Sequence, residues 1–244
     1  MNIVFMGTPE FALPTLKKIH DSSHSILSVV TQPDRPKGRG QKQVDSPIKK
    51  FALKSNLPLL QPTSVNTQEF IGSLLVNRPD YIIVVAFGQI LSEAFLKTPK
   101  QFCINLHSSL LPKYRGAAPI NRAILNGENR SGVTTMIMDK GMDTGDILLV
   151  DETPIELSDD AQSLHDKLSE QGGKLVLETL SRLKKNDLLP TPQNSDLASY
   201  APKLKKYESL IDWEMDAENI FNKVRGLSPW PGTHTLYNGK RLAI

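Results

Sequence analysis

Two polar residues with acid–base and hydrogen-bonding chemistry stand at the end of an apolar run, Phe102-Cys103-Ile104-Asn105-Leu106-His107. Alternate residues of a strand share a face, so Asn105 and His107 are predicted to point the same way. Ligands of open parallel sheets bind just beyond the carboxyl ends of the strands, and this is where the pair should lie. An imidazole beside an amide can stabilise an oxyanion and move a proton. A purely structural histidine is the competing interpretation, and the amide on the same face weakens it.

A carboxylate is predicted to join this pair. Asp143 lies in a glycine-punctuated loop, Met138-Asp139-Lys140-Gly141-Met142-Asp143-Thr144-Gly145-Asp146, between two apolar runs. A βα return would bring this loop to the sheet edge where His107 ends its strand. A carboxylate there can orient the imidazole and stabilise its charged form.

The elements that must position these residues alternate between strands and helices, which predicts an α/β fold with an open, Rossmann-like, mostly parallel sheet. The continuous apolar run Tyr81–Ala86 predicts a strand buried at the centre of that sheet. Helices are expected from Pro9 to about Ser22, capped by Thr8, and from Asp159 to about Lys185, capped by Ser158. The other predicted strands are Ile3–Met6, Ser25–Thr31, Leu57–Leu60, Thr134–Met138 and Ile147–Val150, and the other predicted helices are Pro47–Asn56, Thr67–Arg78 and Pro119–Asn126. After His107, Pro112 favours an extended segment.

Composition divides the chain in two. Residues 1–187 are expected to form the catalytic domain, and the proline-rich, polar stretch 188–206 a linker. Residues 207–244 then begin a second unit, with a helix from Ala217 to Arg225 and a hairpin turn at Asn238-Gly239. A single hairpin is marginally stable, so this second domain is expected to be incomplete.

Charge and cysteine content narrow the function classes. The whole chain carries a formal charge of +3, yet residues 35–50 hold six cations and one acid, which suits a local patch for a polyanion. Cys103 is the only cysteine, so an internal disulfide and a cysteine-rich zinc site are excluded. The histidines show no metal-ligand spacing. No apolar window reaches membrane-spanning length and no signal peptide is visible, so a cytoplasmic protein without membrane contact is expected.

Together these residues carry a resemblance. Asn-x-His, then Ser-Leu-Leu-Pro-x-Tyr-Arg-Gly, then Met-Asp-x-Gly-x-Asp-Thr-Gly-Asp resembles the signature of the formyltransferases that use 10-formyltetrahydrofolate. The resemblance implies that His107 stabilises the oxyanion and assists proton transfer, that Asn105 donates to the same oxygen, and that Asp143 holds His107 or an ordered water. Strand-end loops should line the folate pocket with Phe87, Gly88, Ser109, Leu110, Leu111, Pro112, Asp139, Lys140, Gly141 and Met142. No metal is required.

The amine acceptor separates members of this family. The loop Gln32–Gly40 resembles the one with which some members grip the acceptor arm of initiator methionyl-tRNA, and residues 207–244 resemble the start of their oligonucleotide-binding β-barrel. This implies a monomer that formylates methionyl-tRNA for translation initiation, with Arg35, Lys37, Arg39 and Lys42 on the nucleic acid. Other interpretations stay open: a solvated surface loop, a different folate-dependent formyltransferase, a hydrolase that passes the formyl group to water, or an inert RNA-binding module.

Overall fold

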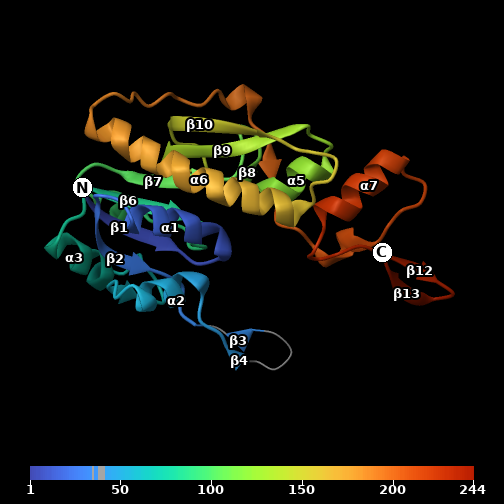
Figure 1. Ribbon diagram of the computed structural model, residues 1–244, viewed down its shortest axis with the longest axis horizontal. Helices are drawn as coiled ribbons and strands as arrows, with labels where there is room; N and C mark the ends of the chain where they lie inside the picture. Colours follow the sequence, from blue (N-terminus) through green and yellow to red (C-terminus); the bar gives the residue numbers. More distant parts are fainter. Residues whose placement is uncertain (35, 38–41) are drawn as a thin grey trace.

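A seven-stranded sheet forms the centre of the molecule. The computed structural model describes residues 1–34, 36–37 and 42–244, with only the backbone at 36–37 and 42–43. The strand order is β10-β9-β7-β6-β1-β2-β5, and the five strands from β7 to β5 run parallel (Figure 1). The predicted open, mostly parallel sheet is therefore confirmed. The strands are β1 Asn2–Gly7, β2 Ser25–Val30, β5 Leu59–Leu60, β6 Tyr81–Val85, β7 Cys103–His107, β9 Arg130–Ile137 and β10 Ile147–Pro154.

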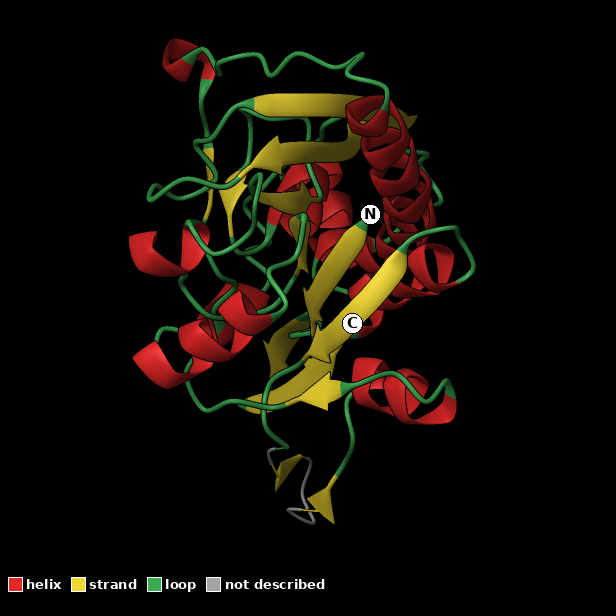
Figure 2. Ribbon diagram, turned by 90° about the vertical axis from the view of Figure 1, so that its left-hand side faces the viewer, coloured by secondary structure: helices red, strands yellow, loops and turns green. Residues whose placement is uncertain are grey.

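Helices cover both faces of the sheet (Figure 2). One apolar core lies beneath α1 (Leu13–His20), α2 (Pro47–Lys54), α5 (Pro119–Leu125) and α6 (Ala161–Lys184). A second core lies beneath α3 (Gln68–Val76) and α4 (Glu93–Leu96) on the opposite face. Alternation along β7 sends Ile104 and Leu106 into the first core and Cys103 into the second. Asn105 and His107 therefore point toward the α3–α4 side.

Two predicted helix caps are wrong. The Thr8 hydroxyl donates to the Phe87 carbonyl at 3.3 Å, and the chain enters α1 through a short 3-10 helix, η1 (Glu10–Ala12). The N-cap of α6 is Asp160, whose carboxylate accepts from the Ser163 amide at 2.8 Å. A carboxylate at this position also meets the positive end of the helix dipole, which a serine hydroxyl does not exploit.

The chain path after β7 differs from the prediction in two ways. The segment 108–114 bends and turns, so the predicted extended crossing is wrong. β9 then pairs antiparallel with β7, with Ile137 opposite Ile104, so the predicted βα return is also wrong. β9 therefore ends at the start of β7, where the Met138 amide donates to the Cys103 carbonyl at 2.9 Å. The loop 138–146 must run back along the sheet to reach the end of β7.

Residues 188–244 pack against the sheet domain rather than trailing from it. β11 (Tyr200–Ala201) pairs with β8 (Arg115–Gly116), and η2 (Ser195–Leu197) precedes it. The Arg122 guanidinium of α5 makes two bonds, at 2.6 and 3.0 Å, to the Glu208 carboxylate of η3 (Lys206–Ser209). α7 (Ala217–Gly226) lies beside α5 in Figure 1, and the Asn121 amide donates to the Gly226 carbonyl at 2.8 Å.

Two small hairpins leave the body of the molecule. β12 (His234–Tyr237) and β13 (Lys240–Ala243) are joined by Asn238 and Gly239, whose φ angles of 49° and 72° confirm the predicted turn. β3 (Pro36–Lys37) and β4 (Lys42–Gln43) project from the end of the molecule near α2 (Figures 1 and 2). Across the described ranges, no helix is both long and apolar enough to cross a membrane.

Candidate active site

His107 is held by the turn that follows its own strand. Its Nε2 lies 2.9 Å from the Tyr114 carbonyl oxygen, and the side chain is 8% exposed. A carbonyl oxygen can only accept, so Nε2 carries the hydrogen of the neutral ring. This leaves Nδ1 directed at Asp143, with 3.8 Å between Nδ1 and Oδ2. The imidazole is thus fixed with one nitrogen available to exchange a proton.

Asp143 reaches this position through the returning loop 138–146. Its backbone is left-handed, with φ of 54°, and its Oδ2 accepts from the Gly116 amide at 2.8 Å. Gly116 itself has φ of 119°, and a Cβ there would lie 2.9 Å from the Ala201 carbonyl oxygen, so a side chain is excluded. The position of the Asp143 carboxylate therefore depends on the close approach of β8 and β11.

Gln193 ties the same loop to the sheet domain. Its Nε2 donates to the carbonyls of Asp143 and Gly145 at 2.9 and 2.7 Å. Its Oε1 accepts from Nε and Nη2 of Arg115, at 3.1 and 2.7 Å, and Arg115 is 3% exposed. Sequence reasoning missed both residues, because Gln193 stands in the predicted linker. The one signal in the sequence was the place of Arg115 within the Tyr-Arg-Gly signature.

The turn that presents the Tyr114 carbonyl is itself pinned. Tyr114 has φ of 60°, a region that non-glycine residues seldom adopt. Its phenol donates to Glu128 at 2.8 Å, and burial, reinforced by that carboxylate, raises the pKa of Tyr114 to about 12. The Thr134 hydroxyl donates to the Ser109 carbonyl at 2.6 Å. Such unusual backbone at a site persists because surrounding contacts over-determine it.

A cavity of about 570 Å³ contains Asn105, His107 and Asp143. This volume is within the range of small-molecule sites. Its first wall, on the α3–α4 side, is formed by Val84, Phe87 and Met138. Ala86 and Gly88, at the end of β6, also line the cavity. Its second wall lies across the sheet edge, near η1, α5 and α6, and consists of Pro9, Phe11, Ala118, Ile120 and His165. Asn105, His107 and Asp143 line the same cavity as these apolar residues.

The predicted folate residues do not all line this cavity. Phe87 and Gly88 do, and Gly88 has φ of 88° with open space where a Cβ would stand. The other predicted folate residues do not line the cavity; they are Ser109, Leu110, Leu111, Pro112, Asp139, Lys140, Gly141 and Met142. The segments that contain them contribute their neighbours Ser108, Met138 and Asp143 to the lining. Ser109 turns its hydroxyl to the Lys113 carbonyl at 2.6 Å.

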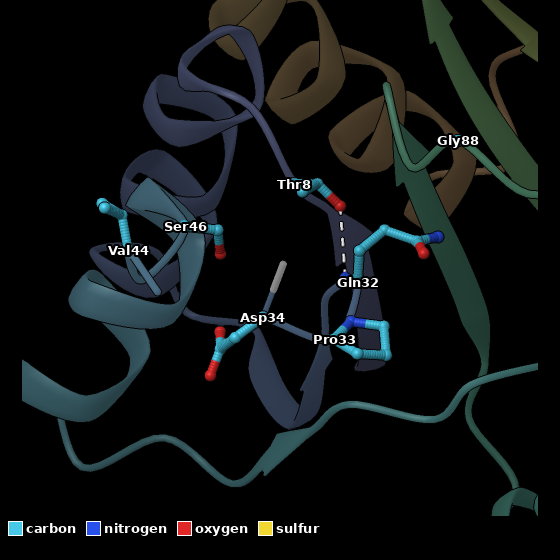
Figure 3. A pocket seen from close by; sticks show the side chains of 7 residues that line it. All are labelled: Thr8, Gln32, Pro33, Asp34, Val44, Ser46 and Gly88. Atoms are coloured by element: carbon cyan, nitrogen blue, oxygen red, sulfur yellow. Dashed lines mark hydrogen bonds between the residues drawn. The ribbon is translucent and has the colours of Figure 1, made fainter. Parts of the chain in front are cut away.

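A smaller pocket of about 220 Å³ adjoins the cavity through Gly88 (Figure 3). It lies at the ends of β1 and β2, and the Gln32 amide donates to the Thr8 hydroxyl across it at 3.3 Å. The Lys49 ammonium and the Gln61 amide hold the pKa of the Asp34 carboxyl below its usual range. Asp34 and Val44, which line this pocket, flank the β3–β4 pair in the sequence.

Of the four predicted nucleic-acid residues, Lys37 and Lys42 fall on this hairpin. Arg35 and Arg39 lie outside the described residues. Lys37 and Lys42 are opposite each other in the β3–β4 pair, where only their backbone is described. Within the described ranges, no group of three or more His, Cys, Asp or Glu residues could hold a metal ion.

Comparison with known proteins identifies the family of this site. A model described as "Formyl transferase" matches residues 1–180, nearly three quarters of the chain. The chain belongs to the formyl transferase family. A second model, "Formyl transferase, C-terminal domain", matches residues 203–244. The resemblance of the Asn-x-His and Asp-Thr-Gly signatures is thereby confirmed.

Curated relatives agree along the whole chain. The methionyl-tRNA formyltransferase of Citrifermentans bemidjiense is 52% identical over 244 residues, which are 100% of this chain and 77% of that protein. That of Caldanaerobacter subterraneus subsp. tengcongensis is 53% identical over 245 residues, 100% of this chain and 79% of that protein.

Solved structures share the fold of this formyl transferase. A 4-N formyltransferase from Francisella tularensis superposes with a TM-score of 0.77 at 17% identity, covering 100% of this chain and 96% of that one. WlaRD, a sugar 3N-formyl transferase solved in the presence of dTDP and 5-N-formyl-THF, gives 0.74 at 22% identity, with 99% and 84% covered. HypX from Aquifex aeolicus, in complex with tetrahydrofolic acid, gives 0.72 at 20% identity, with 100% of this chain and 37% of HypX covered.

Proposed function

We propose that this formyl transferase moves the formyl group of 10-formyltetrahydrofolate onto the amino group of initiator methionyl-tRNA, in support of translation initiation. The observation that carries the proposal is identity of about half the residues, over the full chain, with relatives named methionyl-tRNA formyltransferase. The polar set Asn105, His107 and Asp143 in one cavity supports it, because an imidazole, an amide donor and a carboxylate can provide the proton transfer and oxyanion stabilisation that formyl transfer to an amine needs.

Formyl transfer makes three demands on the chain. The amine must lose its proton, the tetrahedral oxyanion must be stabilised, and the leaving nitrogen must be protonated. 10-Formyltetrahydrofolate supplies the activated formyl carbon. The Asn105 amide donates to the developing oxyanion, and one such donor contributes on the order of 3 kcal/mol at the transition state.

His107 is assigned the proton transfers. Because Nε2 is committed to the Tyr114 carbonyl, Nδ1 takes the proton from the attacking amine. The protonated ring donates to the oxyanion and then passes this proton to the folate nitrogen as the bond between that nitrogen and the formyl carbon breaks. Asp143, 3.8 Å away, attracts the charged imidazole and orients it or an intervening water. Its carboxylate is held in place by the Gly116 amide.

The first wall of the cavity fits the folate. Left-handed backbone at Ala86 and Gly88 turns peptide groups at the end of β6, which suits recognition of the edge of a flat heterocycle. We place the pterin against Phe87 and Gly88 and extend the folate site to the neighbouring loops 109–112 and 139–142.

The β3–β4 hairpin and the segment 207–244 are assigned to the tRNA. The hairpin lies beside the smaller pocket, which adjoins the cavity at Gly88, and residues 35–50 are strongly basic. Arg39 is placed in the acceptor-stem groove, because arginine makes paired hydrogen bonds that lysine cannot. Residues 1–187 then act as catalytic domain and 207–244 as part of a tRNA-binding domain, in a monomeric, bacterial-type enzyme of the cytoplasm.

The deciding experiment measures where the formyl group goes. Labelled 10-formyltetrahydrofolate is incubated with initiator methionyl-tRNA, and label on tRNA is compared with free formate. Replacing Asn105, His107 or Asp143 with Ala should lower kcat by ~10² or more while tRNA binding persists. The exposed residues Asn77, His20 and Asp151 provide matched Ala controls away from the cavity. Label found only in formate would identify a hydrolase, and an active His107→Ala variant would remove the mechanism.

Acceptor binding has its own test. Values of kcat/KM on initiator tRNA are measured at two salt concentrations for wild type, Arg39→Lys, Arg39→Ala and Lys42→Ala. Transfer should weaken steeply with salt as phosphate contacts release counterions. Arg39→Ala should cost more than Lys42→Ala, and Arg39→Lys should also lose activity. Three variants equal to wild type would mean that the acceptor is a smaller amine.

A further inference from the structure

One of the six cations in residues 35–50 is engaged inside the protein. The Lys49 ammonium contacts the carboxylates of both Asp34 and Asp45, with 2.8 Å between Nζ and Oδ1 of Asp45. The Lys49 side chain is 16% exposed, whereas Lys50, the next residue of α2, is exposed. Hydrogen bonds to Asp34 and then Asp45 raise the pKa of Lys49 above its usual range. The charge of Lys49 is therefore balanced within the protein, unlike a lysine that is offered to phosphate.

The two carboxylates flank the β3–β4 hairpin. Asp34 lies two residues before β3, and Asp45 lies two residues after β4. One ammonium thus joins the segment that enters the hairpin to the segment that leaves it. The hairpin projects from the body of the molecule, so its orientation depends on contacts at its base (Figures 1 and 2). A segment that is already held in its binding orientation loses less conformational freedom when its partner arrives.

Lys49 acts from a rigid position. It lies in the first turn of α2, where its amide donates to the Ser46 hydroxyl at 3.0 Å. Ile48 and Ala52 of the same helix are fully buried. The Ser46 hydroxyl also lies 3.1 Å from the hydroxyl of Thr31, which directly follows β2. The ammonium of Lys49 is therefore carried by a helix that is fixed to the core and to the sheet.

Gln61 fixes the entering side of the hairpin. Its Nε2 donates to the Gln32 carbonyl and to Oδ1 of Asp34, each at 3.0 Å. The other oxygen of Asp34, Oδ2, accepts from the Lys49 ammonium. The side chain of Asp45 is 43% exposed and pairs with the same ammonium. Lys49 therefore carries the restraint from the well-fixed Asp34 to the more exposed Asp45.

We propose that Asp34, Lys49 and Asp45 form a clamp that holds the base of the β3–β4 hairpin in the orientation that receives the tRNA, so that Lys49 is a positioning residue rather than a phosphate ligand. This inference rests on the proposed function. If charge alone mattered, Asp45 would be unfavourable, because a carboxylate beside a polyanion repels it. The clamp makes the same carboxylate favourable, because its loss releases one side of the hairpin. The two roles predict opposite effects when Asp45 is removed.

The test measures KM for initiator methionyl-tRNA and kcat of formyl transfer with the full chain. Asp45→Ala should raise KM about threefold or more and Lys49→Met about tenfold, with kcat within about twofold of wild type. Because Asp45 acts through Lys49, the double variant should have the KM of Lys49→Met. Lys49→Arg should restore most of the wild-type KM, because a guanidinium can bond two carboxylates at once.

Lys50→Met is the matched control, because it removes the same charge from an exposed position one residue away. Its effect on KM should shrink as salt is raised, whereas the effect of Lys49→Met should persist, because salt screens exposed charges more than partly buried ones. Thermal unfolding confirms that each variant is folded, and Asp45→Ala decides if Lys49→Met does not fold. An unchanged or lower KM for Asp45→Ala would overturn the clamp alone. A wild type that leaves methionyl-tRNA unformylated would overturn the proposed function together with it.

Discussion

Gln193 offers the sharpest test of how the fold positions the carboxylate of the active site. Its side chain joins the buried Arg115 to the loop of Asp143 through four hydrogen bonds, at 3.1, 2.7, 2.9 and 2.7 Å. Gln193→Ala leaves the buried guanidinium donors without this acceptor and frees two loop carbonyls. Stability should fall by about 2–4 kcal/mol, mostly from the unsatisfied donors. Displacing the Asp143 carboxylate by about 1 Å should lower kcat up to ~10²-fold.

A second substitution separates these two effects. Gln193→Glu keeps an acceptor for Arg115, now charge-assisted, but turns an oxygen toward the carbonyls of Asp143 and Gly145. Stability should stay within about 1 kcal/mol of wild type, while kcat should fall as far as in the Ala variant. Urea unfolding and formyl transfer are the two measurements. Gln171→Ala on α6, which removes a 3.3 Å hydrogen bond to the Glu152 carbonyl of β10 and a hydrogen bond from the Thr153 hydroxyl, controls for loss of a glutamine elsewhere. A Glu variant with wild-type kcat would show that Gln193 does not position the loop.

Three further outcomes follow from the geometry. Gly88→Val should weaken binding of a folate analogue, measured by calorimetry, because φ of 88° strains any side chain placed at the first wall; unchanged affinity would count against the folate assignment. Gly172→Val should lower the free energy of unfolding by about 1–3 kcal/mol, because a Cβ there would lie 2.5 Å from the side chain of Leu106. Leu106 separates Asn105 from His107 in the sequence. A variant as stable as wild type would mean that α6 can shift. Burial raises the pKa of the Cys103 thiol to about 12. A thiol reagent should therefore react very slowly with the native chain at pH 9 and readily with the chain unfolded in urea. Rapid labelling of the native chain would show that β7 opens.

Local patterns in the sequence were sufficient to predict the central strand of the sheet and the shared orientation of Asn105 and His107. The apolar run Tyr81–Ala86 predicted the central strand, and β6 is buried along its whole length. Period-two alternation placed Asn105 and His107 on one face, and both line the cavity. Asn238-Gly239 predicted its hairpin because the turn needs two residues with positive φ. In each case the determining interaction joins residues close in the sequence.

Only the tertiary structure decided how Asp143 reaches His107. An apolar run has no direction, so the residues of β9 could not reveal that the strand is antiparallel to β7. The Tyr114 carbonyl that fixes the imidazole belongs to the main chain and leaves no trace in residue type. Gln193 looked like part of a polar linker, yet it bonds residues about 50 and 80 positions away in the sequence. These contacts depend on close approach of distant segments, which the packing of β8, β11 and the returning loop creates and which no local pattern encodes.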